Sequence, residues 1–113
     1  MSRTVEPAAD TLENLRMELR RGCLVLAVLG ALKTEQSGYT LRKALSEIGL
    51  EIDEGTLYPL LRRLETQGLL ESQWREEDRR NKRFYRLSAA GKAILKQLTA
   101  EWKAIDAALG EIL

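Results

Sequence analysis

The sequence has 113 residues and a net charge of +1 from 18 basic and 17 acidic side chains, and 44% of its residues are hydrophobic. This length predicts one small globular domain. The sequence contains no histidine and one cysteine, Cys23, which excludes an internal disulfide, a histidine–cysteine zinc site and the commonest general base. No phosphate-binding or nucleophile motif is present, so we expect no enzyme, no metal and no cofactor.

The sequence carries no pattern typical of a membrane or exported protein. The longest apolar run, from Cys23 to Ala31, is far shorter than the roughly 20 residues that a membrane-spanning helix needs. The first ten residues lack the features of a secretory signal peptide. We therefore expect a cytoplasmic protein with no membrane partner.

The first predicted element is a long helix that follows a flexible tail over residues 1–9. Asp10 and Glu13 have the spacing of a capping box, and the helix is expected to reach about Leu32. Residues 24–29 are apolar on all sides, which predicts that the second half of this helix is the more buried. Earlier apolar residues recur at steps of three and four; they are Leu12, Leu15 and Leu19.

Two shorter helices are predicted next. Residues 39–48 place apolar side chains at i, i+3, i+4 and i+7, with Gly49 as a left-handed stop. Residues 54–67 repeat the pattern, with Asp53 as the N-cap and Gly68 as the stop. The predicted inward faces comprise Leu41, Ala44, Leu45 and Ile48 in the first of these helices and Leu57, Leu60, Leu61 and Leu64 in the second.

From residue 70 the apolar period changes to two, which predicts a pair of antiparallel strands. Trp74 on the first strand is expected in the core or at the base of the hairpin. The second strand covers residues 83–87, where we interpret Phe84 and Tyr85 as strand packing rather than base stacking. The connection over residues 76–81 is charged and lacks glycine, so we expect a loose hairpin tip and not a two-residue turn.

The last predicted element is a helix that begins after Ser88, whose hydroxyl caps it, and runs to the C-terminus. Its apolar residues have heptad spacing. A lone amphipathic helix cannot hide such a seam within a small domain, so we expect it to pair with a second copy, with the first helix packing across it. The residues predicted to form this dimer interface are Leu12, Leu15, Leu19, Leu95, Leu98, Trp102, Ile105, Leu109 and Ile112.

Three helices, a hairpin and a final helix are the order of a winged helix-turn-helix protein. We therefore predict a mainly α fold with a small β-hairpin, with a DNA-binding domain over residues 10–87 and a C-terminal dimerisation helix over 88–113. Residues 79–86 hold five basic and no acidic side chains, which places a basic cluster on the wing. The predicted contacts to double-stranded DNA are Gly55, Thr56, Tyr58, Pro59, Arg62, Arg63, Arg79, Arg80, Lys82 and Arg83.

Several of these features have a second interpretation. The wing cations could form a solvated face paired with the acids at residues 76–78, and Pro59 could simply be tolerated in its helix. Cys23 is interpreted as a buried inert thiol, with a redox sensor as the alternative. The same fold could also serve a winged-helix adaptor that binds a protein rather than DNA. A small enzyme is disfavoured because no nucleophile–base pair is present.

The motifs resemble those of one family of regulators. The segment GTLYPLLRRLETQGLLES (residues 55–72), preceded by Gly38-Tyr39-x-Leu41 and followed by RFYRLSAAGK, is similar to the PadR family of bacterial transcriptional regulators over roughly residues 15–100. One departure is residues 79–81, Arg-Arg-Asn, where the family often has a Gly-Arg-Pro-like turn. The resemblance implies a homodimeric repressor of a pseudo-palindromic operator, with Tyr39 among the DNA contacts.

The resemblance also implies a site for an effector. In some proteins of the family, aromatic residues at the dimer interface stack flat hydrophobic ligands. A site for a small aromatic effector is therefore expected between two copies of the chain, lined by Leu98, Trp102 and Ile105. The alternative is that Trp102 only packs the interface.

Overall fold

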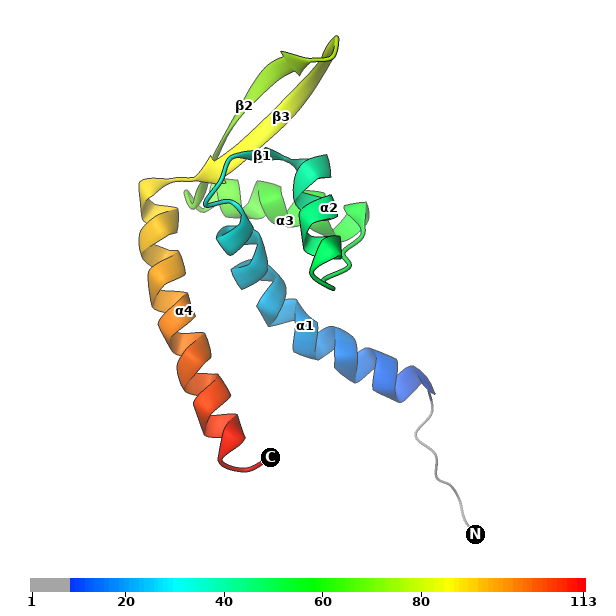
Figure 1. Ribbon diagram of the computed structural model, residues 1–113, viewed down its shortest axis with the longest axis vertical. Coiled ribbons are helices and arrows are strands. Elements are labelled where there is room, and N and C mark those ends of the chain that lie inside the picture. The colour runs from blue at the N-terminus through cyan, green and yellow to red at the C-terminus, as the bar shows by residue number, and fades with distance from the viewer. Residues whose placement is uncertain (1–8) are drawn as a thin grey trace.

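The structure is a computed structural model, and it describes residues 9–113. The described elements are α1 (Ala9–Ala31), β1 (Gln36–Ser37), α2 (Gly38–Glu47), α3 (Glu54–Thr66), β2 (Leu70–Glu77), β3 (Arg80–Leu87) and α4 (Ala89–Gly110). Helices α2 and α3 and the base of the sheet form a head, from which the β2–β3 hairpin projects on one side while α1 and α4 extend on the other (Figure 1). The predicted order of helices and hairpin is confirmed.

Helix α1 has a buried half and an exposed half, as its sequence predicted. Val28 and Leu29 are fully buried near its C-terminal end. The predicted capping box is wrong, because Asp10 lies inside the first helical turn and cannot act as the N-cap. Glu13 instead forms an ion pair with Arg16 at 2.6 Å. Ala9, which we expected in the tail, belongs to this helix, and the rest of that tail lies outside the described residues.

Leucine side chains from all four described helices meet in one core. All four leucines predicted on the inward face of α3 are buried, as are Leu41 and Leu45 of α2. Ile48, predicted on the same face of α2, is instead 71% exposed. Helix α2 has ended by that residue, and the chain turns away through Gly49, whose φ is +90°. The helical period therefore no longer applies at Ile48.

A close backbone approach fixes the start of α4. Ser88 caps the helix as predicted, because its hydroxyl accepts a hydrogen bond from the amide of Gly91 at 2.9 Å. A β-carbon at Gly91 would overlap the carbonyl oxygen of Leu69, so glycine is needed for this approach. The first turns of α4 are thereby held against the head, and Leu95 is packed in the core.

The sheet has three antiparallel strands among the described residues, one more than we predicted. The short strand β1 pairs with β3, so the strand order is β1-β3-β2. Two residues are too few to display a period of two, so β1 could not be predicted from apolar periodicity. Strands β2 and β3 pair from Leu70 opposite Leu87 to Glu77 opposite Arg80. The hairpin is therefore longer than the predicted one by several pairs.

The tip of the hairpin is a two-residue turn, and our prediction of a loose loop is wrong. Asp78 and Arg79 connect the strands with φ values of +54° and +64°. Two consecutive residues with positive φ are the geometry of a type I′ turn, which matches the twist of the flanking strands. Aspartate tolerates this conformation, whereas a residue such as arginine adopts it at a cost of roughly 1–2 kcal/mol. The absence of glycine had concealed the turn.

The molecule is elongated because α1 and α4 leave the head as diverging arms (Figure 1). Its extents are 62 × 32 × 24 Å and its Cα radius of gyration is 17.3 Å, whereas a compact domain of about 100 residues has a radius near 13 Å. Among residues 9–113, no helix has an apolar stretch long enough to cross a bilayer.

Candidate nucleic-acid interface

Side chains from α2, α3 and the hairpin meet around one surface cavity of about 330 Å³. We call the β2–β3 hairpin the wing. The cavity lies where α3 faces the base of the wing. Three cations and four aromatic rings line it, and none of its described lining residues is acidic. A basic hollow with aromatic walls is suited to a polyanion. The lining residues are Ser37, Gly38, Tyr39, Tyr58, Arg62, Trp74, Lys82, Arg83 and Tyr85.

Tyr58 of α3 is held against the start of α2. A β-carbon at Gly38 would overlap the Tyr58 ring, so this glycine allows the two helices to approach. Ser37 caps α2 by accepting a hydrogen bond from the amide of Thr40 at 3.2 Å. Tyr58 is consequently half-buried, whereas Tyr39, on the first turn of α2, is exposed. Both tyrosines border the cavity.

The outward face of α3 is exposed at Pro59, Arg62 and Arg63. The helix continues through Pro59 without a break, and because proline has no N–H, the carbonyl of Gly55 lacks its usual helical donor. Among residues 9–113, neither arginine has an acidic partner within ion-pair distance. Two guanidinium groups on this face therefore remain able to bind bases or phosphates.

The start of α3 has a different character. The hydroxyl of Thr56 donates a hydrogen bond to the Asp53 carboxylate at 2.8 Å, and this bond lowers the pKa of Asp53 below its usual range. Asp53 occupies the predicted N-cap position, but its side chain makes no cap hydrogen bond. Gly55 and Thr56 lie beside this carboxylate, and neither lines the cavity, which takes only Tyr58 and Arg62 from the described residues of α3.

The basic residues of the wing fall into two groups. Arg79 and Arg80 at the tip are exposed, and neither forms an ion pair with another residue of the described chain. Lys82 pairs with Glu77 at 3.0 Å, so for this lysine the alternative of pairing within the wing is confirmed. Arg83 is turned toward α3, where its guanidinium lies 3.0 Å from a carboxylate oxygen of Glu65.

Of the two places predicted for Trp74, the core is wrong and the base of the wing is confirmed. It is 63% exposed, although it shares a strand face with the buried Leu70. The core ends before Trp74 because the wing projects beyond the helices that cover the sheet (Figure 1). The indole borders the cavity instead, with the Arg83 guanidinium 5.7 Å from its ring centroid. Sequence reasoning missed this residue as part of the interface.

Phe84 and Tyr85 both pack within the protein, as predicted. Tyr85 is buried in the core, and this burial raises the pKa of its hydroxyl above the usual range. Phe84 is half-buried on the other face of β3, where the guanidinium of Arg75 stacks 4.0 Å from its ring centroid.

Most of the residues predicted for a dimer interface lie exposed on the two arms. Leu95 is an exception, because it is packed in the core of its own chain, and Leu98 packs partly against that core. Cys23 is half-buried on α1. The exposed members of the predicted interface are Leu12, Leu15, Leu19, Trp102, Ile105, Leu109 and Ile112.

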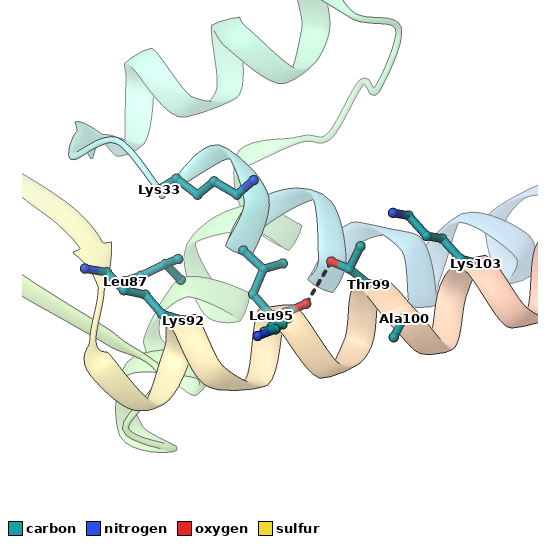
Figure 2. A pocket seen from close by; sticks show the side chains of 8 residues that line it. Lys33, Leu87, Lys92, Leu95, Thr99, Ala100 and Lys103 are labelled. Atoms are coloured by element: carbon teal, nitrogen blue, oxygen red, sulfur yellow. Dashed lines mark hydrogen bonds between the residues drawn. The ribbon is translucent and has the colours of Figure 1, made fainter.

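A second cavity, of about 570 Å³, lies along α4 at the end of α1. Figure 2 shows Lys33, in the turn that follows α1, facing this space, with Thr99 and Lys103 on α4 directed toward α1. The residues that we predicted around an effector do not line this cavity, because they lie on the neighbouring stripe of α4. The lining residues are Lys33, Leu87, Lys92, Leu95, Lys96, Thr99, Ala100 and Lys103.

A helix pair, a third helix with an exposed polar face and a hairpin beside it define a winged helix-turn-helix protein. The sequence model described as "Transcriptional regulator PadR-like family" matches residues 25–97, and the chain belongs to this family. The resemblance inferred from the motifs is confirmed. The family comprises transcriptional regulators and not enzymes, and among residues 9–113 no three potential metal ligands cluster.

Similar proteins include regulators from several bacteria. The chain is 39% identical over 97 residues to "Transcriptional regulator Rv3488" of Mycobacterium tuberculosis, a match covering 85% of this chain and 88% of that protein. A PadR family transcriptional regulator from Eggerthella lenta superposes with a TM-score of 0.85 at 39% identity, covering 91% of this chain and 92% of the other. A transcriptional regulator from Clostridium thermocellum gives 0.76 at 25% identity, covering 85% and 98%.

Proposed function

We propose that this PadR-family regulator binds operator DNA as a homodimer and acts as a cytoplasmic repressor. The observation that carries the proposal is the basic, aromatic cavity at which α3 meets the wing. Regulators of this family bind DNA, and in winged helix-turn-helix proteins the third helix enters the major groove. Four guanidinium groups without an acidic partner in residues 9–113 flank this surface, at Arg62, Arg63, Arg79 and Arg80.

The candidate residues divide by the contact that each can make. Arg62 lies on the exposed face of α3 one turn after Tyr58 and can reach a guanine edge in the major groove. The hydroxyls of Tyr39 and Tyr58 suit phosphate oxygens. Arg79 and Arg80, at the end of the wing, suit the neighbouring phosphate backbone.

The two arms support a homodimer. Apolar side chains on both α1 and α4 are exposed in the described part of the chain, residues 9–113, and exposed apolar surface of this extent marks an interaction site. A two-fold pair of chains would present two α3 helices to DNA half-sites about 34–36 Å apart, and the operator would be pseudo-palindromic.

The test is selection of bound DNA from a random pool with purified full-length protein. A palindromic enriched motif is expected. Absence of enrichment would contradict DNA binding and would favour the alternative, a winged-helix adaptor that binds protein.

Arg62→Ala then separates the two contacts that this arginine can make. A base contact predicts a loss of about 1–3 kcal/mol confined to one position of each half-site, whereas a phosphate contact weakens binding to all single-base variants alike. Arg86→Ala is the control, because Arg86 is an exposed arginine that pairs with Glu71 on the sheet at 3.1 Å. Unchanged affinity across the panel would remove Arg62 from the interface.

A small aromatic effector that releases the DNA is the second part of the proposal. The cavity along α4 has an apolar floor and four lysines with no acidic partner among the described residues, which favours an aromatic anion over a neutral ring. An effector must bind the DNA-incompetent state more tightly in order to act. Planar aromatic acids are expected to weaken operator binding, and Lys103→Gln to raise the concentration required. Equal action of neutral analogues would contradict a role for the lysines.

A further inference from the structure

Three side chains from three elements close a hydrogen-bonded ring where the wing leaves the head. Arg83 on β3 donates from Nη2 to Oε1 of Glu65 on α3 at 3.0 Å and from Nε to the hydroxyl of Ser72 on β2 at 2.8 Å. The Ser72 hydroxyl donates in turn to Oε2 of Glu65 at 2.6 Å. All three residues are half-buried, so water competes for these bonds less than at an open surface.

This ring uses the directional groups of Arg83. A guanidinium presents its donors in a planar fork, and here two of the donor atoms are directed to the acid and the hydroxyl rather than to solvent. The group also lies within 6 Å of the ring centroids of Trp74 and Tyr85, at 5.7 and 5.8 Å. Arg83 is therefore fixed on several sides, unlike the arginines at the wing tip.

The wing needs such a constraint. From residue 73 to residue 81 every residue of the hairpin is exposed, and a two-stranded ribbon is marginally stable by itself. The six residue-to-residue steps from Ser72 to Asp78 form a lever of about 20 Å, so a rotation of about 10° at the base moves the tip by roughly 3.5 Å. A displacement of this size would break any hydrogen bond between the tip and a phosphate.

We propose that the Glu65–Ser72–Arg83 ring is a brace that fixes the angle between the wing and α3, and that Arg83 is a positioning residue rather than a phosphate contact. The inference rests on the proposed DNA binding for its functional consequence. It differs from the sequence-based prediction that Arg83 is a direct contact, and it adds two residues, Glu65 and Ser72, to the candidate site.

The brace and a simple electrostatic role predict opposite changes in DNA affinity for Glu65→Met. Glu65→Met keeps the length and helix propensity of the side chain but removes both acceptors. If charge alone matters, loss of an acid beside a polyanion site should strengthen DNA binding. If the brace matters, the wing loses its fixed angle and binding should weaken. Arg83→Lys gives a second contrast, because lysine keeps the charge but not the planar fork.

The experiment measures operator affinity and its salt dependence for full-length wild type, Glu65→Met, Arg83→Met, Arg83→Lys and the double methionine variant. Each single variant is expected to weaken operator binding at least tenfold. The double variant is expected to weaken it by no more than either single methionine variant does. The slope of log K against log salt should change equally in Arg83→Met and Glu65→Met, because both variants lose the same contacts between the wing tip and phosphates. A direct phosphate contact by Arg83 predicts instead a change of about 0.9 in Arg83→Met alone. Glu71→Met and Arg86→Met remove an exposed cross-strand pair of the same sheet and should change affinity less than threefold.

A measurement without DNA keeps this inference separate from the proposed function. Backbone ¹⁵N relaxation should show lower order parameters in the wing of Glu65→Met than in wild type or Glu71→Met. Wild-type protein that binds no DNA would refute the proposed function, while the relaxation data would still decide the brace. Tighter binding by Glu65→Met, additive effects of the two methionine variants, a slope change of about 0.9 in Arg83→Met that Glu65→Met does not share, or an unchanged wing in Glu65→Met would each overturn the brace.

Discussion

Trp102→Ala is the most direct test of the proposed dimer, because Trp102 is the largest side chain on the exposed seam of α4 and alanine preserves the helix. Trp102 is 45% exposed within a single chain. A tryptophan presents about 200 Å² of surface, so about 90 Å² per chain is left for a partner to cover. At about 25 cal/mol per Å², that area contributes about 2 kcal/mol per protomer and about 4–5 kcal/mol to a two-fold pair.

The dissociation constant of the dimer is therefore expected to rise about a thousandfold. Sedimentation equilibrium over a dilution series measures it, and circular dichroism checks that α4 is retained. Gln97→Ala is the matched control, since Gln97 is an exposed residue of α4 away from the seam. The dimer dissociation constant of this variant should differ from that of wild type by less than threefold. A dissociation constant for Trp102→Ala equal to that of wild type would refute the inference from exposed apolar surface to interface.

Three further substitutions test the local structure. Gly91→Ala is expected to lower the free energy of unfolding by about 1–3 kcal/mol through steric overlap, whereas Gly30→Ala, in open space, should raise it by about 0.5–1 kcal/mol; equal effects in urea unfolding would contradict the close approach of α4. Arg79→Gly should stabilise the turn by about 0.5–1 kcal/mol, because glycine adopts a positive φ without strain; a loss of stability would argue against the two-residue turn. The same substitution should reduce the slope of log K against log salt for operator binding by about 0.9. Thr56→Val should raise the pKa of Asp53 toward its ordinary value, because the hydrogen bond that favours the carboxylate is lost. The stability that disappears as pH falls through this pKa should therefore disappear at a higher pH than in wild type. An NMR titration that finds the same Asp53 pKa in both proteins would show that the bond is absent.

Some features of the interface were predictable from local sequence alone. The exposed face of α3, with Arg62 and Arg63, follows from the inward leucines because a helix of known period has only one opposite side. The composition around residues 79–83 likewise located the basic wing. Sequence could not tell which of these cations would be held by acids of the same chain, because the partner of Arg83 is 18 residues away on another element.

The order of helices and hairpin, their approximate ends and the apolar seam of α4 follow from the local sequence, because they depend on periodicity, capping and glycine over a few neighbouring residues. Which apolar residues are covered depends on how the elements pack against one another. Trp74 has the strand period of a core residue but lies beyond the edge of the core, while Leu95 has the spacing of the dimer seam but packs inside its own chain. Burial depends on where a whole element ends relative to its neighbours, and a local pattern carries no information about that distance.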